Sequence, residues 1–253
     1  MAGPELKIRI GQSTLTLADF FTDHPPSIWY ADGSCLEGSQ YTELPTIDIR
    51  LYDTSRFITF DWSGIDITKE SQRETKDQNT IQHKLIQHLQ NDASYEIIFD
   101  DDGSGEAADV VAVRVVSENE QNFIDVELYH CKYAGGQPGA RIDDLYIVCG
   151  QAQRSTTWLI NQNRRTELFT HLLRRDDLRI SQNRSTRFER GDSPTLTRIR
   201  DMSRRCDMRL MVWIVQPGLS SLAASNSQLT LLAVTERYLT DTYQIPLQVI
   251  CSL

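Results

Sequence analysis

The sequence predicts a mixed α/β (α+β) fold, in which helices flank a mixed central sheet and a small β-rich lobe precedes it. Two observations predict this class. From about residue 80 the patterns run helix, strand, strand, strand, helix, strand, helix, strand. The runs VVAVRVV and LMVWIV barely alternate between apolar and polar residues, as expected of strands that helices cover on both faces.

The first 70 residues predict the β-rich lobe, because short strand patterns alternate there with turn residues. Strands are expected in ELKIRIG, SIWYADGSCLEG, TIDIRLYD, RFITFDW and GIDI, and one or two helical turns in LTLADFF. The polar stretch TKESQRETKDQN is the best boundary, which gives a lobe over 1–70 and a second domain over 71–253. Trp29, Tyr30 and Trp62 suit base stacking or core packing, and core packing is favoured.

The second domain begins with a helix in TIQHKLIQHLQ, where Ile81, Leu85, Ile86 and Leu89 form one apolar stripe. Runs rich in Val, Ile and aromatic residues then predict three adjacent strands. The remaining elements follow in order: strands in YEIIFD, ADVVAVRVV and FIDVELYHCKY, a helix in RIDDLYIVCGQAQRSTTWLI, a strand in MRLMVWIVQPGL stopped by Gln-Pro-Gly, a helix in NSQLTLLAVTERYL and a strand in IPLQVICSL.

Composition excludes several classes of protein. The 253 residues are 40% hydrophobic and 24% charged, which excludes disorder, collagen and coiled coil. No apolar run approaches the roughly 18–20 residues that cross a bilayer, and MAGPELKIRI lacks the apolar stretch of a secretory signal. We therefore expect a cytoplasmic protein with no membrane partner. The five scattered cysteines form no CxxC pair and are expected to be reduced and mostly buried.

The charge is unevenly distributed. Residues 161–205 hold 12 Arg, no Lys and six acids, a net of +6, whereas the rest of the chain carries −15. Arginine forks on an acidic body are typical of phosphate contact, so this Arg-rich insertion predicts nucleic-acid binding. A solvated surface or a dock for an acidic protein is the alternative. The candidate contacts are Arg154, Arg164, Arg165, Arg174, Arg175 and Arg187.

A candidate catalytic pair lies at the strand ends. Asp109 opens the second of the three strands and Lys132 closes the third, where strand periodicity places His130 and Lys132 on one face. In phosphodiester hydrolysis a carboxylate holds a divalent metal that activates water, and a lysine orients that water or offsets developing charge. Asp109 and Lys132 are suited to these roles. A turn-capping aspartate and a lysine extended from a strand end are the structural alternatives.

At these residues the chain resembles the PD-(D/E)xK nuclease superfamily, the restriction-endonuclease-like fold. The motif is Asp109 followed by His130-Cys131-Lys132, and the resemblance covers about residues 80–160 and 208–253. It implies a nuclease that uses Mg²⁺ or Mn²⁺, with DNA as the expected substrate and RNA as the alternative. His130 stands where that family carries an acid or Gln. Imidazole ligates Mn²⁺ well and Mg²⁺ poorly, which leaves both the activity and the metal open.

The resemblance also implies auxiliary residues. Gln82 on the first helix takes the position of an auxiliary Glu or Gln at the metal site, and Gln151 that of a Gln directed to the active site or the DNA backbone. Simple helix-surface or cap roles are the alternative for both. Glu106, three residues before Asp109, can supply the missing oxygen ligand. Asp109, Glu106 and His130 are thus the candidate metal ligands. The neighbouring run Asp100–Asp102 is expected to be a solvated loop.

Segments such as IFDDDGSGEAADVVAV and YHCKYAGGQPGARIDDLYIVCGQAQ are similar to the C-terminal nuclease-like module of bacterial DEAD/DEAH-box helicases linked to phage defence. This resemblance implies a role in bacterial antiviral defence or DNA processing with a helicase partner. The chain has no GxxxxGK[ST] motif, so any ATP-driven motor must lie outside it. The competing hypothesis is a catalytically silent nuclease-like fold that binds nucleic acid or assembles with a helicase, and the histidine at position 130 favours it.

Overall fold

The computed structural model describes residues 6–24, 26–30, 33–43, 50–158 and 166–253. The chain divides into an N-terminal unit, residues 1–49, and a main unit, residues 50–253. The expectation of a boundary at residue 70 differs from this division, because the strand at Phe57–Thr59 pairs with the last strand of the main sheet. Within the described ranges, no helix is both long and apolar enough to cross a membrane.

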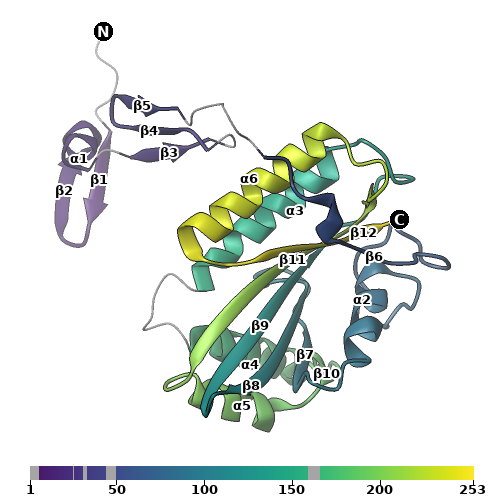
Figure 1. Cartoon of the computed structure of the whole chain (residues 1–253). Helices are drawn as coiled ribbons and strands as arrows, with labels where there is room; N and C mark the ends of the chain where they lie inside the picture. The colour runs from purple at the N-terminus through teal and green to yellow at the C-terminus, as the bar shows by residue number, and fades with distance from the viewer. Residues whose placement is uncertain (1–5, 25, 31–32, 44–49, 159–165) are drawn as a thin grey trace. The chain divides into compact units, whose positions relative to one another are not determined.

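The N-terminal unit consists of two small antiparallel sheets and a short helix (Figure 1). Its elements are β1 (Lys7–Ile10), β2 (Ser13–Thr16), α1 (Leu17–Asp23), β3 (Ser27–Trp29), β4 (Cys35–Glu37) and β5 (Gln40–Thr42). None of its described apolar side chains is buried. Trp29 is 69% and Tyr30 45% exposed, so the expected core packing is wrong for both, whereas Trp62 of the main unit is buried. Part of the expected strand TIDIRLYD lies outside the described residues.

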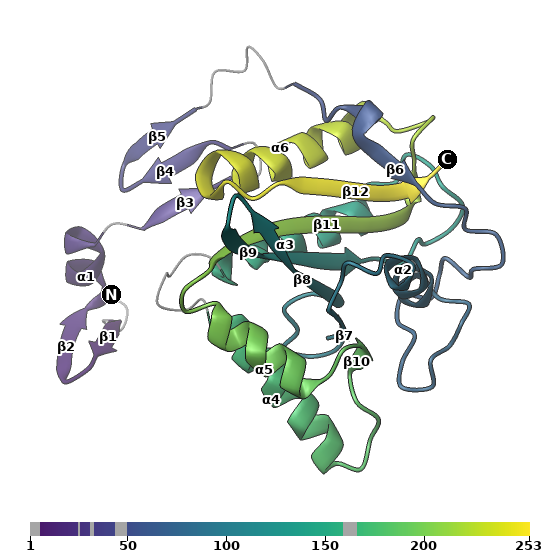
Figure 2. The same cartoon turned by 60° about the horizontal axis from the view of Figure 1, so that its bottom comes forward.

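A seven-stranded mixed sheet forms the centre of the main unit, with strand order β10-β7-β8-β9-β11-β12-β6 (Figure 2). Its strands are β6 (Phe57–Thr59), β7 (Ile97–Asp100), β8 (Val110–Glu118), β9 (Gln121–Cys131), β10 (Phe188–Arg190), β11 (Asp207–Ser220) and β12 (Leu247–Ser252). β7, β8 and β9 are antiparallel neighbours, and β9, β11, β12 and β6 run parallel. The three adjacent strands expected from the sequence are therefore confirmed.

Two hydrophobic cores lie on the two faces of this sheet. The residues of α2 (Ile81–Gln90) pack with the inward side chains of one face, including Val110, Ala112 and Cys131. The opposite face carries the larger core, with residues of the other helices. Those helices are α3 (Asp143–Arg154), α4 (Glu167–Ser181), α5 (Ser193–Met202) and α6 (Asn226–Tyr243). Strands covered on both faces explain why VVAVRVV and LMVWIV hardly alternate.

The element order helix, three strands, helix, strand, helix, strand is observed as expected from residue 81 onward. The Arg-rich insertion adds α4, β10 and α5 between α3 and β11. One difference concerns Gln-Pro-Gly, which does not end its strand. β11 continues to Ser220, and its pairing with β12 shifts register between Val215 and Ser220, where Pro217 has no N–H to donate. The predicted strand GIDI is absent from the main unit as described.

Candidate metal and phosphate site

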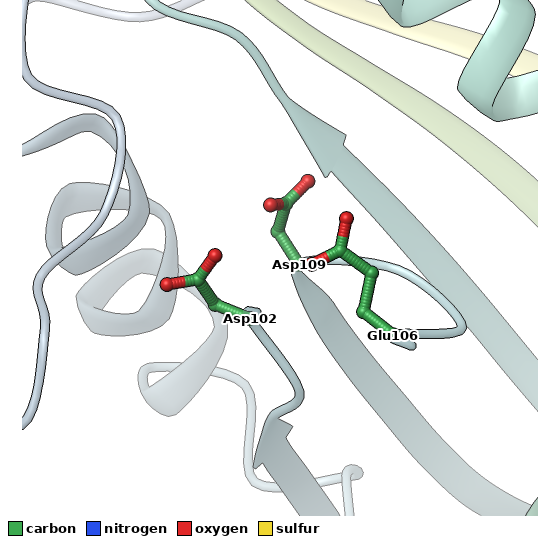
Figure 3. Close-up of side chains that lie close together, drawn as sticks. All are labelled: Asp102, Glu106 and Asp109. Carbon is green, nitrogen blue, oxygen red and sulfur yellow. The ribbon is translucent and has the colours of Figure 1, made fainter. Parts of the chain in front are cut away.

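Three carboxylates meet at the connection between β7 and β8. Asp102 and Glu106 lie on the loop, Asp109 immediately precedes β8, and one oxygen of each lies within 4.8 Å of the others. Figure 3 shows the three side chains directed into the same space. The loop turns through Gly103 at φ 115° and Gly105 at φ 82°, conformations that favour glycine. This compact turn brings Glu106 back beside Asp109.

Each of the three carboxylates has one oxygen held by a neighbouring donor. Ser71 donates its hydroxyl to Asp102 Oδ2, the Gly103 N–H donates to Glu106 Oε2 over 2.8 Å, and the Cys131 N–H donates to Asp109 Oδ2 over 2.8 Å. Among the described residues, no hydrogen bond engages the other carboxylate oxygen of any of the three. Donors of this kind orient metal ligands in proteins. Each carboxylate is therefore held by a donor and keeps one oxygen that is available to a cation.

Burial and mutual repulsion make this cluster unfavourable as three bare anions. Asp109 is 2% exposed, and burial, followed by the charge of Glu106, raises its pKa well above the usual range. Burial also raises the pKa of Glu106, with a further contribution from Asp102 and opposing ones from Arg175 and Arg154. Hard oxygen donors with excess negative charge match Mg²⁺ or Mn²⁺. The donor set consequently fits the metal that the sequence predicted.

The expectation of a solvated acidic loop is wrong for Asp100 and Asp101, which are 3% and 0% exposed. Asp100 accepts from Gln82 Nε2 over 2.9 Å and Gln72 Nε2 over 3.1 Å. Asp101 forms an ion pair with Arg175 and accepts from the Ala107 N–H over 2.7 Å. Both carboxylates are buried because these partners replace water. They fix the loop, so that Asp102 alone of the three is left to face the site.

Two of the predicted phosphate-binding arginines also hold this loop. Arg175 donates to the carbonyl oxygens of Asp101 and, over 2.7 Å, Ser104. Arg187 donates to the carbonyl oxygens of Asp100 over 2.8 Å and Asp102 over 3.1 Å. Their guanidinium groups are thus engaged within the protein. These bonds give both arginines a structural role, and their contact with phosphate stays a prediction.

Other predicted arginines differ in their surroundings. Arg174 is exposed on α4. Arg154 is exposed at the end of α3, close enough to lower the pKa of Glu106. Arg164 and Arg165 lie outside the described residues. Arg154 and Arg174 therefore remain the described candidates for phosphate contact.

Lys132 follows the last residue of β9 and pairs with Glu70. Its Nζ lies 2.9 Å from Glu70 Oε2 and 4.6 Å from the centre of the Tyr133 ring. Desolvation lowers the pKa of Lys132, but Glu70, with a smaller contribution from Asp109, raises it above the usual value overall. The lysine is held as a cation near the carboxylate cluster, as the strand ends suggested.

His130 does not belong to the three-carboxylate group. Its Nε2 lies 2.7 Å from Ser155 Oγ, and complete burial, with a smaller effect of Arg154, lowers its pKa from 6.5 to about 3. It is a neutral residue in the interior, on the sheet face opposite Tyr129 and Cys131. Its role as a metal ligand stays a prediction that this geometry does not favour.

The two glutamines predicted to assist the site have different positions. Gln82 is buried on α2 and donates from Nε2 to the Asp109 carbonyl oxygen over 3.1 Å as well as to Asp100. Through the bond to the Asp109 carbonyl oxygen, Gln82 holds the backbone where β8 begins. Gln151 is half-buried on α3, one turn before the end of that helix, and its Oε1 is buried without a hydrogen-bond partner in the part of the chain described.

Two residues at the site were not singled out from the sequence. Asp102 belongs to an acidic run next to a glycine, a signal that the structure now connects with Asp109. Glu70 lies far from Lys132 in the chain and within a polar stretch, so no local pattern points to it. Comparison with protein-family models, curated proteins and solved structures finds no match for the chain.

Proposed function

We propose that the main unit is a divalent-metal-dependent nuclease. The observation that carries the proposal is the group of three carboxylates, Asp102, Glu106 and Asp109, which have one oxygen each within 4.8 Å of the others. Lys132 is close enough for the charge of Asp109 to raise its pKa. Asp109 and Glu106 keep the metal-ligand roles expected from the sequence, and Asp102 replaces His130 as the third ligand. Mg²⁺ or Mn²⁺ bound there supplies a Lewis acid that polarises a phosphate oxygen and lowers the pKa of water.

The chain's own residues perform the remaining tasks. Lys132, held protonated beside Glu70, offsets the negative charge that develops on the phosphate in the transition state. Gln82 and the Cys131 N–H fix the backbone and side chain of Asp109. Arg154 and Arg174 are positioned on exposed helix surfaces to contact the nucleic-acid backbone. DNA is the proposed substrate, with RNA as the alternative.

The element order of the main unit supports the PD-(D/E)xK assignment. A helix, three antiparallel strands, a helix and a strand parallel to the third follow one another, and Asp109 and Lys132 lie at the ends of the second and third strands. The restriction-endonuclease-like fold is proposed on this basis. Action in bacterial defence or DNA processing with a helicase rests on the resemblance of the quoted segments alone.

One observation favours the catalytically silent alternative. The ammonium of Lys132 is already paired with Glu70, and His130, in place of the usual acid, is bonded to Ser155. A lysine satisfied by a protein carboxylate is less free to approach a phosphate. A silent fold would still use its exposed arginines to bind nucleic acid.

Cleavage of plasmid and linear duplex DNA, with Mg²⁺ and separately with Mn²⁺, tests the proposal. Cleavage by the purified chain that falls sharply in Lys132→Ala and disappears in Asp109→Asn supports a nuclease, and Asp109→Asn controls for contaminating enzyme. No cleavage with either metal, accompanied by salt-sensitive DNA binding, contradicts the nuclease proposal and favours the silent fold.

A further inference from the structure

The backbone of Glu70 is held in place by hydrogen bonds to the start of α2. Its backbone carbonyl accepts from the Gln82 N–H over 3.0 Å, and the Lys69 carbonyl accepts from the Ile81 N–H over 3.1 Å. These are N–H groups of the first turn of α2, which have no partner within the helix. The start of α2 thus holds residues 69 and 70 in place.

The side chain of Glu70 is fixed as well. The same oxygen that lies 2.9 Å from Lys132 Nζ also accepts the Tyr133 N–H over 3.0 Å. A backbone bond from Ala134 N–H to the Ile67 carbonyl, 2.7 Å long, joins the two segments on the other side. The Glu70 and Lys132 side chains are only 23% and 13% exposed, so solvent screens their interaction incompletely. Glu70 therefore sets both the position and the direction of the lysine.

The next residue of the same segment contacts the metal ligands. Ser71 donates its hydroxyl to Asp102, as described above. Residues 70 and 71 consequently contact the two chemical parts of the site, the lysine and the carboxylate cluster. No ligand role is needed to explain Glu70, because its carboxylate is directed at Lys132 and does not belong to the three-carboxylate group.

We propose that Glu70 is a positioning residue that holds Lys132 in the direction required at the scissile phosphate. This inference rests on the proposed nuclease function. Glu70 acts through Lys132 and does not touch substrate, so removing it matters only while Lys132 is present. The pair also keeps a flexible four-carbon side chain ordered before substrate arrives, which preorganises the cation for the transition state.

A double-mutant cycle on DNA cleavage tests this coupling. Glu70→Ala is expected to lower kcat about 10–100-fold, the range typical of outer-shell partners, with KM changed little. In the Lys132→Ala background the same substitution is expected to have almost no further effect. Equal effects of Glu70→Ala in the two backgrounds, or wild-type kcat in Glu70→Ala, overturn the inference. The matched control is Glu236→Gln, which removes a carboxylate from the separate ion pair with Arg56.

A second measurement does not depend on activity. An ordered, ion-paired ammonium gives a slowly exchanging ¹H–¹⁵N signal, assigned to Lys132 by its absence in Lys132→Ala. We expect this signal in the wild type and in Glu236→Gln and its loss in Glu70→Ala. Its persistence in Glu70→Ala overturns the inference. A signal that depends on Glu70 in a chain that cleaves no DNA leaves the lysine-positioning pair intact and overturns the nuclease proposal instead.

Discussion

The Cys131 N–H donates to Asp109 Oδ2 over 2.8 Å, so the end of β9 orients the carboxylate that opens β8. The hairpin register explains this contact. Val110 is paired with Tyr129, and the ladder runs from there to Glu118 opposite Gln121. A two-residue turn at Asn119 and Glu120, both with positive φ, closes it. The position of the Asp109 carboxylate is thus fixed by a turn at the far end of the hairpin.

Asp109→Asn is expected to abolish stabilisation by Mn²⁺. The amide oxygen can still accept from Cys131, but one of the three ligand charges is lost. In the wild type, Mn²⁺ at about 100 times its Kd stabilises by about 2.7 kcal/mol, which raises Tm by about 5–10 °C for a chain of this size. Differential scanning fluorimetry measures the shift. Asp125→Asn, which removes a carboxylate paired with Arg209 at 2.6 Å, is the control and should retain it.

Mn²⁺ binding is expected to strengthen as pH rises. The pKa values of Asp109 and Glu106 are raised in the folded protein, chiefly by burial, so protons compete with the metal for these oxygens. In the metal-free protein the raised pKa of Asp109 has the opposite consequence for folding. Its stabilising contribution is complete below the unfolded value of 3.8 and declines as pH rises toward the folded pKa. Calorimetric titration at pH 6 and pH 8 checks the first point, and equal Kd values there contradict it.

His130→Gln is expected to make the protein less sensitive to acid. The pKa of His130 is lowered to about 3, against 6.5 unfolded, because burial disfavours its charged form. Its contribution to stability is therefore present above pH 6.5 and is lost as pH falls toward 3, at up to about 1.4 kcal/mol per pH unit. Glutamine can keep a hydrogen bond to Ser155 without taking up a proton. The free energy of unfolding, measured with urea at several pH values between 6.5 and 5, should fall less steeply with decreasing pH in the variant than in the wild type. An equal decrease in the two proteins contradicts this assignment.

Local patterns predicted most of the main unit, since its predicted helices carry an apolar stripe and its long strands are runs rich in Val, Ile and aromatic residues. The stripe of Ile81, Leu85, Ile86 and Leu89 is an example, and all four are buried. Local patterns could not predict the features that depend on partners distant in the sequence. β6 belongs to the main sheet because Phe57–Thr59 pairs with β12, almost 200 residues later. The boundary expected at residue 70 overlooked that pairing.

In the candidate site, too, local sequence patterns predicted some residues, and others depend on partners that are distant in the sequence. Asp109 and Lys132 were predicted from their positions at strand ends, which the strand patterns reveal. The alternation of side chains along a strand predicted that Lys132 and His130 share one face of the sheet. Lys132 follows the end of β9, however, and its ammonium forms an ion pair with Glu70. Asp101 looks like a solvated acid in the sequence and is fully buried, because Arg175 reaches it from a helix that folds back over the loop. Such long-range ion pairs leave no periodic signal.

Neighbouring arginines on α4 offer a test of the nucleic-acid surface. Arg174 is exposed, whereas Arg175 pairs with the buried Asp101 and binds loop carbonyls. Arg175→Ala leaves a buried carboxylate unpaired and is expected to lower the free energy of unfolding by about 3–5 kcal/mol. Arg174→Ala is expected to change it by less than about 0.5 kcal/mol. Urea unfolding of the two variants separates these outcomes.

The affinity for DNA should distinguish the same two variants in a different way from their stability. If Arg174 contacts one phosphate, Arg174→Ala weakens binding to all DNA sequences and reduces the slope of log K against log salt by about 1. Fluorescence anisotropy between 50 and 200 mM salt, with Ca²⁺ in place of the catalytic metal, measures both quantities on folded protein. An unchanged affinity and slope in Arg174→Ala would remove α4 from the proposed DNA surface. If Arg175→Ala has the wild-type free energy of unfolding, the structural role of Arg175 is contradicted. The phosphate-binding role predicted from the sequence is then the remaining one for Arg175.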